Sequence, residues 1–176
     1  MKKLVAACLL LSSFSALSFT EPELAALKDA ALAEPTIQTC ITAGDDGCVA
    51  NWFNAPSEFI VWKTSLIDTD VYADHGFDFT LVDGLNVGKR DEWTNFLFKN
   101  GSCNPSKLNI RNGIADVWSG TAGKVAVQNA ILALSKRPAN NAERSLATGA
   151  GTTASPGVMT FEGTVRVDEI HTILGR

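Results

Sequence analysis

The chain has 176 residues, of which 45% are hydrophobic and 19% are charged, and its formal net charge is -4. This composition is typical of one folded globular domain rather than a disordered chain. The mildly acidic balance provides no basic surface for nucleic acid and no polybasic patch for an anionic membrane, so neither partner is expected.

Residues 1–18 have the order of a secretory signal. Lys2 and Lys3 precede an apolar run over 4–11, and the small residues Ala16 and Ser18 fit the positions that a leader peptidase reads. The run is shorter than the roughly 20 apolar residues of a membrane-spanning helix. We therefore expect a signal-like leader at 1–18 and one structural domain over 19–176. The alternatives are an artefact of start-site choice and a buried N-terminal helix.

The domain opens with Thr20-Glu21-Pro22-Glu23, which is a capping box and predicts a helix to about Ala33. Two short helices are expected over 36–54, around the turn at 44–47. Cys40 and Cys48 flank this turn and can form a disulfide in an oxidising compartment, which would leave Cys103 unpaired. The alternative is that all three are ordinary semi-buried thiols.

Phe59-Ile60-Val61-Trp62 is an apolar run too short to assign by its period, so it fits either a strand or a buried helical turn. A helix over about 86–100 follows, with Gly101 as its stop. Asn104 and Pro105 together predict the start of the next helix, which carries Ile110, Ile114, Val117 and Trp118 on one face. Further helices are expected over about 121–136, where Pro138 limits the helix, and over 141–148.

The C-terminal part begins with a loop over 149–157 that is rich in Gly, Thr and Ser. Residues 158–161 and 164–167 predict a small β-hairpin, and Asp168 is expected to cap a last helix over 169–174. The fold expected from these elements is mainly α, a single compact helical domain with a small β-hairpin near the C-terminus.

No residue set predicts catalysis. His75 and His171 are the only histidines, there is no Gly-x-Ser-x-Gly motif, and Cys103 has no local partner. The acidic run over 68–78 lacks the Gly and the final Glu of a calcium loop, and residues 120–124 lack the spacing of a phosphate loop. We therefore expect a protein that is not an enzyme and that carries no metal and no cofactor.

Several longer stretches resemble a family of small proteins from the virion-assembly gene blocks of long-tailed bacteriophages. The matching stretches, which run from about Phe19 to the C-terminus, are FTEPELAALKDAALAEPT, FIVWKTSL, VDGLNVGKRDEW, NPSKLNIRNGIADVW, AILALSKRPANNAERSLATGAGTTASPGVMTFEG and VRVDEI. The resemblance implies a non-enzymatic structural protein that acts in head–tail joining or tail assembly. Its implied partners are other virion proteins and copies of itself, and its implied location is the virion, assembled in the host cytoplasm.

The docking segments expected for such a role are Phe59, Ile60, Val61 and Trp62 and the 149–157 loop, in particular Gly149, Gly151, Thr152 and Thr153. Residues 59–62 fit a core position equally well. The leader and the Cys40/Cys48 pair depart from the family, because its members begin near Phe19 and assemble in the cytoplasm. They favour the alternative of a secreted or periplasmic binding module with a cleaved signal peptide.

Overall fold

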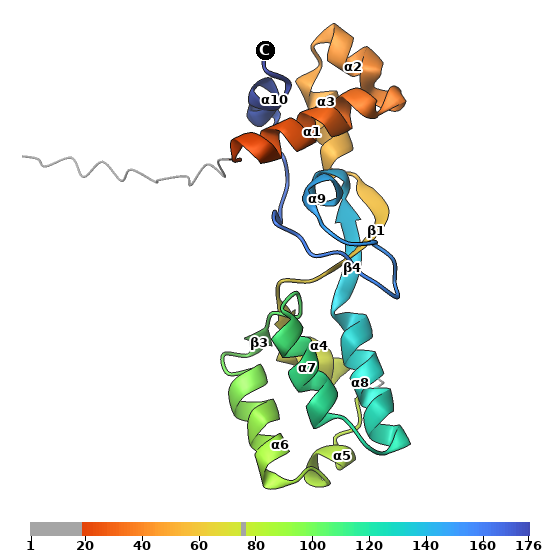
Figure 1. The fold of residues 1–176 in the computed structure, drawn as a ribbon, viewed down its shortest axis with the longest axis vertical. Helices are drawn as coiled ribbons and strands as arrows, with labels where there is room; N and C mark the ends of the chain where they lie inside the picture. The colour runs from red at the N-terminus through yellow and green to blue at the C-terminus, as the bar shows by residue number, and fades with distance from the viewer. Residues whose placement is uncertain (1–18, 75–76) are drawn as a thin grey trace, which may run out of the picture.

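The computed structural model describes residues 19–74 and 77–176, so the expected leader and His75 lie outside the described residues. The fold is mainly α, as the sequence predicts. Figure 1 shows an elongated molecule in which two groups of helices lie at opposite ends of a narrow β-ribbon. Where the sequence suggests one core, the buried apolar side chains form two large clusters, one in each group, and a small third cluster at the ribbon.

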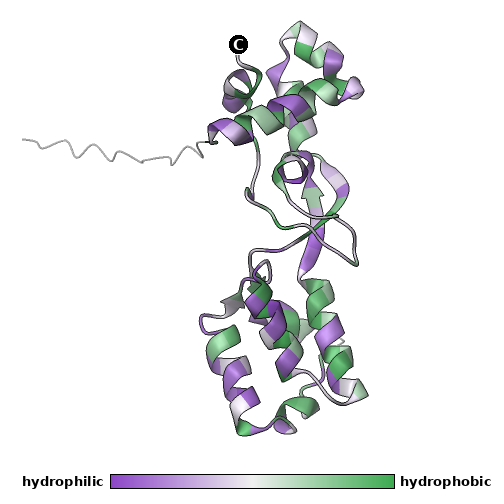
Figure 2. Ribbon diagram, viewed as in Figure 1, coloured by the Kyte–Doolittle hydropathy of each residue, from purple (hydrophilic) through white to green (hydrophobic). Residues whose placement is uncertain are grey.

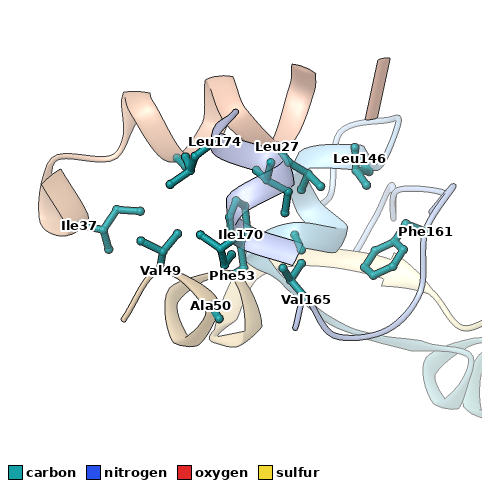
Figure 3. Packing of buried hydrophobic residues seen from close by; sticks show 13 residues of the cluster. Leu27, Ile37, Val49, Ala50, Phe53, Leu146, Phe161, Val165, Ile170 and Leu174 are labelled. Carbon is teal, nitrogen blue, oxygen red and sulfur yellow. The ribbon is translucent and has the colours of Figure 1, made fainter. Parts of the chain in front are cut away.

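The first group combines the two ends of the described chain. It contains α1 (Glu21–Ala33), η1 (Pro35–Ile37), α2 (Gln38–Ala43), α3 (Asp46–Asn54), α9 (Asn141–Leu146) and α10 (Val167–Leu174). The predicted capping box is present, since the backbone N–H of Thr20 donates to the carboxylate of Glu23 over 2.8 Å. Figure 3 shows the buried cluster in which apolar side chains of these helices meet, among them Leu27, Phe53, Leu146 and Ile170.

The second group is made of residues 66–134 and is built around aromatic rings. Its elements are β2 (Leu66–Ile67), α4 (Asp68–Ala73), α5 (Thr80–Asp83), α6 (Val87–Asp91), the π-helical segment η2 (Glu92–Leu97), β3 (Ser102–Cys103), α7 (Leu108–Val117) and α8 (Ala122–Leu134). Trp93 and Trp118 are buried with ring centroids 5.2 Å apart in an edge-to-face arrangement, and Phe77 contacts both. Edge-to-face packing is a favourable geometry for aromatic pairs.

Two predicted helix boundaries in this group differ from the structure. The helix expected over 86–100 begins as predicted, with Asn86 as its cap, but changes to π-helical winding at Glu92. The helix expected from Asn104-Pro105 begins at Leu108 instead. The side chain of Asn104 accepts a hydrogen bond from the N–H of Ser106 over 3.0 Å, which makes a local turn before the helix.

The β-ribbon joins the two groups. Strand β1 (Pro56–Trp62) pairs antiparallel with β4 (Lys136–Asn140), with Val61 opposite Arg137 and Trp62 opposite Lys136. The structure thus assigns residues 59–62 to a strand. Pro138 lies inside β4 opposite Ile60, and α8 already ends at Leu134. Figure 2 shows that β4 is predominantly hydrophilic, whereas the helices of both groups carry hydrophobic residues.

The hairpin expected over 158–167 is not seen in the described residues. Val158 forms an antiparallel bridge with Thr148. Helix α10 begins at Val167, so its N-cap is Arg166 and not the expected Asp168. Asn54 explains the difference, because its side-chain amide donates to the carbonyl of Val165 and accepts from its N–H, both over 2.8 Å. These two bonds satisfy the backbone groups that a hairpin partner would have paired.

No helix within residues 19–74 and 77–176 is long and apolar enough to cross a bilayer.

Candidate contact surface around strand β1

The two segments expected to dock partners pack against each other. The second edge of β1 pairs with the 149–157 loop: the N–H of Ile60 donates to Gly151 over 2.7 Å, and the carbonyl of Ile60 accepts from Gly157 over 2.8 Å. The N–H of Trp62 also donates to the carbonyl of Gly157, over 3.0 Å. The loop is therefore fixed along the strand by backbone hydrogen bonds over part of its length.

Glycine at two loop positions makes this close approach possible. Gly151 has a φ of 67°, and a Cβ on either Gly151 or Gly157 would overlap the ring of Phe59. The ring therefore approaches the backbone at Gly151 and Gly157 more closely than a residue with a Cβ would allow. This contact explains glycine at positions 151 and 157 of the loop as a packing requirement.

The expected docking residues divide into internal and exposed positions. Val61 is fully buried with Ala139 and Met159, and Gly151 is also buried, so these residues serve the fold. Thr152 and Thr153 are exposed at the loop tip, where Thr152 bonds with Ser155 in a tight turn, and Gly149 is exposed as well. Phe59, Ile60 and Trp62 are half-buried.

Trp62 joins the loop tip to the second helical group. The guanidinium of Arg111 lies 4.6 Å and the amino group of Lys136 lies 5.2 Å from the centre of its ring. Arg111 also donates to the carbonyls of Pro105 and Ser106, and Lys136 donates to the carbonyl of Thr153 over 2.9 Å. Cations over an aromatic face are attracted by its quadrupole.

We call the exposed loop tip (152–155) together with Trp62, Arg111 and Lys136 the contact surface.

A buried ion pair links strand β4 to helix α9. The carboxylate of Glu143, which is 2% exposed, accepts two hydrogen bonds from Arg137 over 2.7 and 2.8 Å. It also accepts from the backbone N–H groups of Asn140 and Gly163. Burial alone would raise the pKa of Glu143, but these hydrogen bonds and the Arg137 charge outweigh it and lower the pKa. Arg137 additionally pairs with Glu162.

Two open depressions share Arg144 in their lining. One has a volume of about 340 Å³ and is lined by residues that include Glu34 and Trp52; the other has about 480 Å³ and includes Glu58 and Phe59. Asn141 and Arg144 line both. Sequence reasoning did not single out Arg144, since only the tertiary structure brings α1, α3, α9 and β1 around it.

The residues tested for catalysis lie in separate places. Cys103 is buried in the second cluster, and burial raises the pKa of its thiol to about 12. His171 lies on α10 in the first group, where its Nε2 is 2.9 Å from a carboxylate oxygen of Asp46. This pair lies at an exposed helix end and also involves Arg176, which donates to the same carboxylate. Within the described ranges, no three His, Cys, Asp or Glu side chains gather closely enough to bind a metal ion.

Cys40 and Cys48 are joined by a disulfide, with their Cα atoms 5.9 Å apart. The bridge links α2 to the first turn of α3 across the turn at 44–47. Asp45 caps α3 by accepting from the N–H of Cys48 over 2.9 Å.

No protein-family model matches the chain, and neither a curated protein nor a solved structure is significantly similar to it.

Proposed function

We propose that this chain is a non-enzymatic structural protein of a tailed bacteriophage virion. It acts in head–tail joining or tail assembly by packing against other virion proteins and copies of itself. The proposed class of protein, a virion structural protein, comes from the resemblance of residues 19–176 to virion-assembly proteins. The geometry adds support for a role in packing and contact.

The exposed apolar side chains are the structural observation that carries the proposal. Nine large apolar side chains in the described chain are well exposed, and six of them belong to the second helical group: Ile67, Phe79, Val87, Phe96, Leu108 and Val125. Val87 and Phe96 are about three-quarters exposed, at 75% and 74%. Apolar surface of this kind is stabilised when a protein partner covers it.

The elongated shape supports the same role. Two helical groups separated by a ribbon present more surface than one compact domain of equal length, so one copy can contact several neighbours (Figure 1). The exposed loop tip with Thr152 and Thr153 and the Trp62 contacts lie between the groups, where a neighbour would meet both.

Mass spectrometry of purified particles tests the proposal most directly. We expect the protein at constant copy number in virions of the phage whose genome carries the gene, beside neighbouring genes for capsid, portal or tail proteins. Complete particles that lack the protein would contradict the proposal.

Self-association in solution provides a second test. Sedimentation of the full chain should show oligomers that weaken about tenfold or more with Phe96→Ser, because an apolar anchor in an interface contributes about 1–2 kcal/mol or more. The matched control is Val158→Ser, which removes an exposed apolar side chain beside the ribbon. Equal effects of the two substitutions would contradict a role for the second group.

The disulfide favours a second candidate function, that of a secreted or periplasmic binding module. Disulfides persist in oxidising compartments and are rare in the cytoplasm. An intact mass of the protein from its natural source decides between the two functions. Loss of residues 1–18 together with an oxidised Cys40–Cys48 bridge supports export, and a full-length reduced chain supports assembly in the cytoplasm.

A further inference from the structure

The disulfide ring, residues 40–48, contacts α10 as well as joining α2 to α3. The Cys40–Cys48 bond closes a nine-residue loop that includes the end of α2, the turn at Gly44 and the first residues of α3. Closing such a ring limits the conformations that residues 41–47 can adopt when they are not packed.

The C-terminal end of α10 is bound by this ring. Arg176 donates to the carbonyl of Ile41 over 2.7 Å and to the carboxylate of Asp46. His171 lies 2.9 Å from the other oxygen of the same carboxylate, and its Nδ1 faces the carbonyl of Arg176 at 3.1 Å. The two groups that accept from the side chain of Arg176 therefore lie between the two cysteines.

The position of α10 decides how the first cluster is covered. Ile170, Ile173 and Leu174 are buried in that cluster, and α10 packs against α3 and α1. Figure 3 shows Ile170 and Leu174 in the same cluster of side chains as Phe53, Val49 and Leu27. Displacement of the helix end would expose these side chains, so the contacts at Asp46 and Ile41 support the packing.

We propose that the Cys40–Cys48 disulfide is a redox switch that fixes α10 when it is oxidised and releases the C-terminal end of α10 when it is reduced. This inference concerns regulation and does not depend on the proposed function.

The reductant is a dithiol, either a small one or a protein with a Cys-x-x-Cys pair. One thiolate of the reductant attacks a sulfur of the bridge, which breaks the Cys40–Cys48 bond and forms a mixed disulfide. The second thiol of the reductant then displaces the other cysteine. Two electrons and two protons reach Cys40 and Cys48 as thiols, and the reductant becomes a disulfide.

Exposure of the sulfur-bearing residues fits this exchange. Cys40 and Cys48 are half-buried, and Cys40 also packs against the first cluster, so neither residue is enclosed in the core. Cys103 is buried in the other cluster with a raised pKa, which leaves its thiol protonated and unable to compete as an internal nucleophile. Reduction should therefore act on the ring alone.

Hydrogen exchange of the full chain, with and without dithiothreitol, tests the switch. We expect the amides of 167–176 to exchange about tenfold faster or more after reduction, because the ring no longer fixes its acceptors. The amides of α7 and α8 belong to the other cluster and should not change, which shows that the protein stays folded. Unchanged exchange at 167–176, or a bridge that never forms under oxidising conditions, would overturn the proposal.

Asp46→Asn separates the switch from a general loss of stability. In the oxidised protein this substitution should speed the exchange of 167–176, and reduction should then add less than about twofold, because both changes remove the same contact. Asp168→Asn is the matched control, since it breaks the exposed pair with Arg166 at the other end of α10. Effects of Asp46→Asn and of reduction that simply multiply would show that the ring does not act through Asp46.

Discussion

Single residues in this protein connect segments that lie far apart in the sequence. Glu143 is the clearest case, because one buried carboxylate bonds to Arg137 in β4, to the cap of its own helix α9 and to the N–H of Gly163. A buried charge of this kind is tolerated only with full pairing, and removing one partner leaves the others unpaired.

Glu143→Gln keeps the shape of the side chain and removes its charge. We expect the free energy of unfolding at pH 7 to fall by about 2–3 kcal/mol, because Arg137 loses its buried partner. The lowered pKa of Glu143 means that its contribution is complete above the ordinary value of 4.5 and is lost as the pH falls through the lower folded pKa. Urea unfolding from pH 7 to about pH 3 should therefore show the two proteins converging in acid. A difference that does not change with pH would contradict this assignment.

Gly151→Ala tests the approach of Phe59 to the loop. The new Cβ would overlap the Phe59 ring at a backbone φ of 67°, so we expect a loss of about 2–4 kcal/mol in urea unfolding. Gly44→Ala is the matched control, because Gly44 has nearly the same φ but open space around it. It should cost only about 1–2 kcal/mol, from the left-handed backbone alone. Equal losses would show that the Phe59 contact is unimportant.

At the scale of elements, three side chains join one end of the ribbon to the second helical group and to the 149–157 loop. Trp62 ends β1, Arg111 belongs to α7, and Lys136 begins β4 and bonds to the loop tip at Thr153. The three side chains couple a strand, a helix and a loop. They thus support the geometry at the place where the ribbon enters the second group.

A double-mutant cycle on Trp62→Leu and Arg111→Met measures this coupling. We expect a coupling energy of about 0.5–1 kcal/mol in the free energy of unfolding, since a half-exposed cation over an indole ring contributes that much. The control cycle pairs Trp62→Leu with Arg90→Met, because Arg90 donates to the carbonyls of Asp83 and Leu85 instead. Its coupling should be close to zero. Equal coupling in both cycles would contradict a specific Trp62–Arg111 contact.

At the scale of the whole molecule, the division into two large clusters has consequences for stability. Each cluster contains its own fully buried side chains, such as Ile170 in the first and Ile131 in the second. The narrow ribbon lies between them (Figure 1). Cores with few shared contacts can open separately, so local stability should differ between the two groups.

Ile170→Ala and Ile131→Ala form a matched pair for this prediction. Each deletion should cost about 2–5 kcal/mol within its own cluster. Native-state hydrogen exchange should show that Ile170→Ala lowers protection in α1, α3 and α10, and that Ile131→Ala lowers it in α7 and α8. Loss of protection throughout both groups by either substitution would show one cooperative unit.

The mainly helical class and several helix starts follow from local chemistry in the sequence. Thr20, Asn86 and Thr121 lie at helix starts as predicted, because a cap needs only a side chain and the backbone within the next three residues. The buried positions of Ile114, Val117 and Trp118 also follow from helical spacing. Cys40 and Cys48 were recognisable as a pair because a short turn separates them.

Contacts between distant segments decided the rest. Residues 59–62 form a strand because β4 pairs with one of its edges and the 149–157 loop with the other. No pattern within residues 59–62 predicts either partner. The expected hairpin near the C-terminus does not form because the side chain of Asn54 bonds to the backbone of Val165, more than a hundred residues away. The sequence by itself determined which segments can form helices, since capping and periodicity act within a few residues. Only the tertiary structure decided that the apolar side chains divide into two cores, because burial depends on which distant surfaces meet.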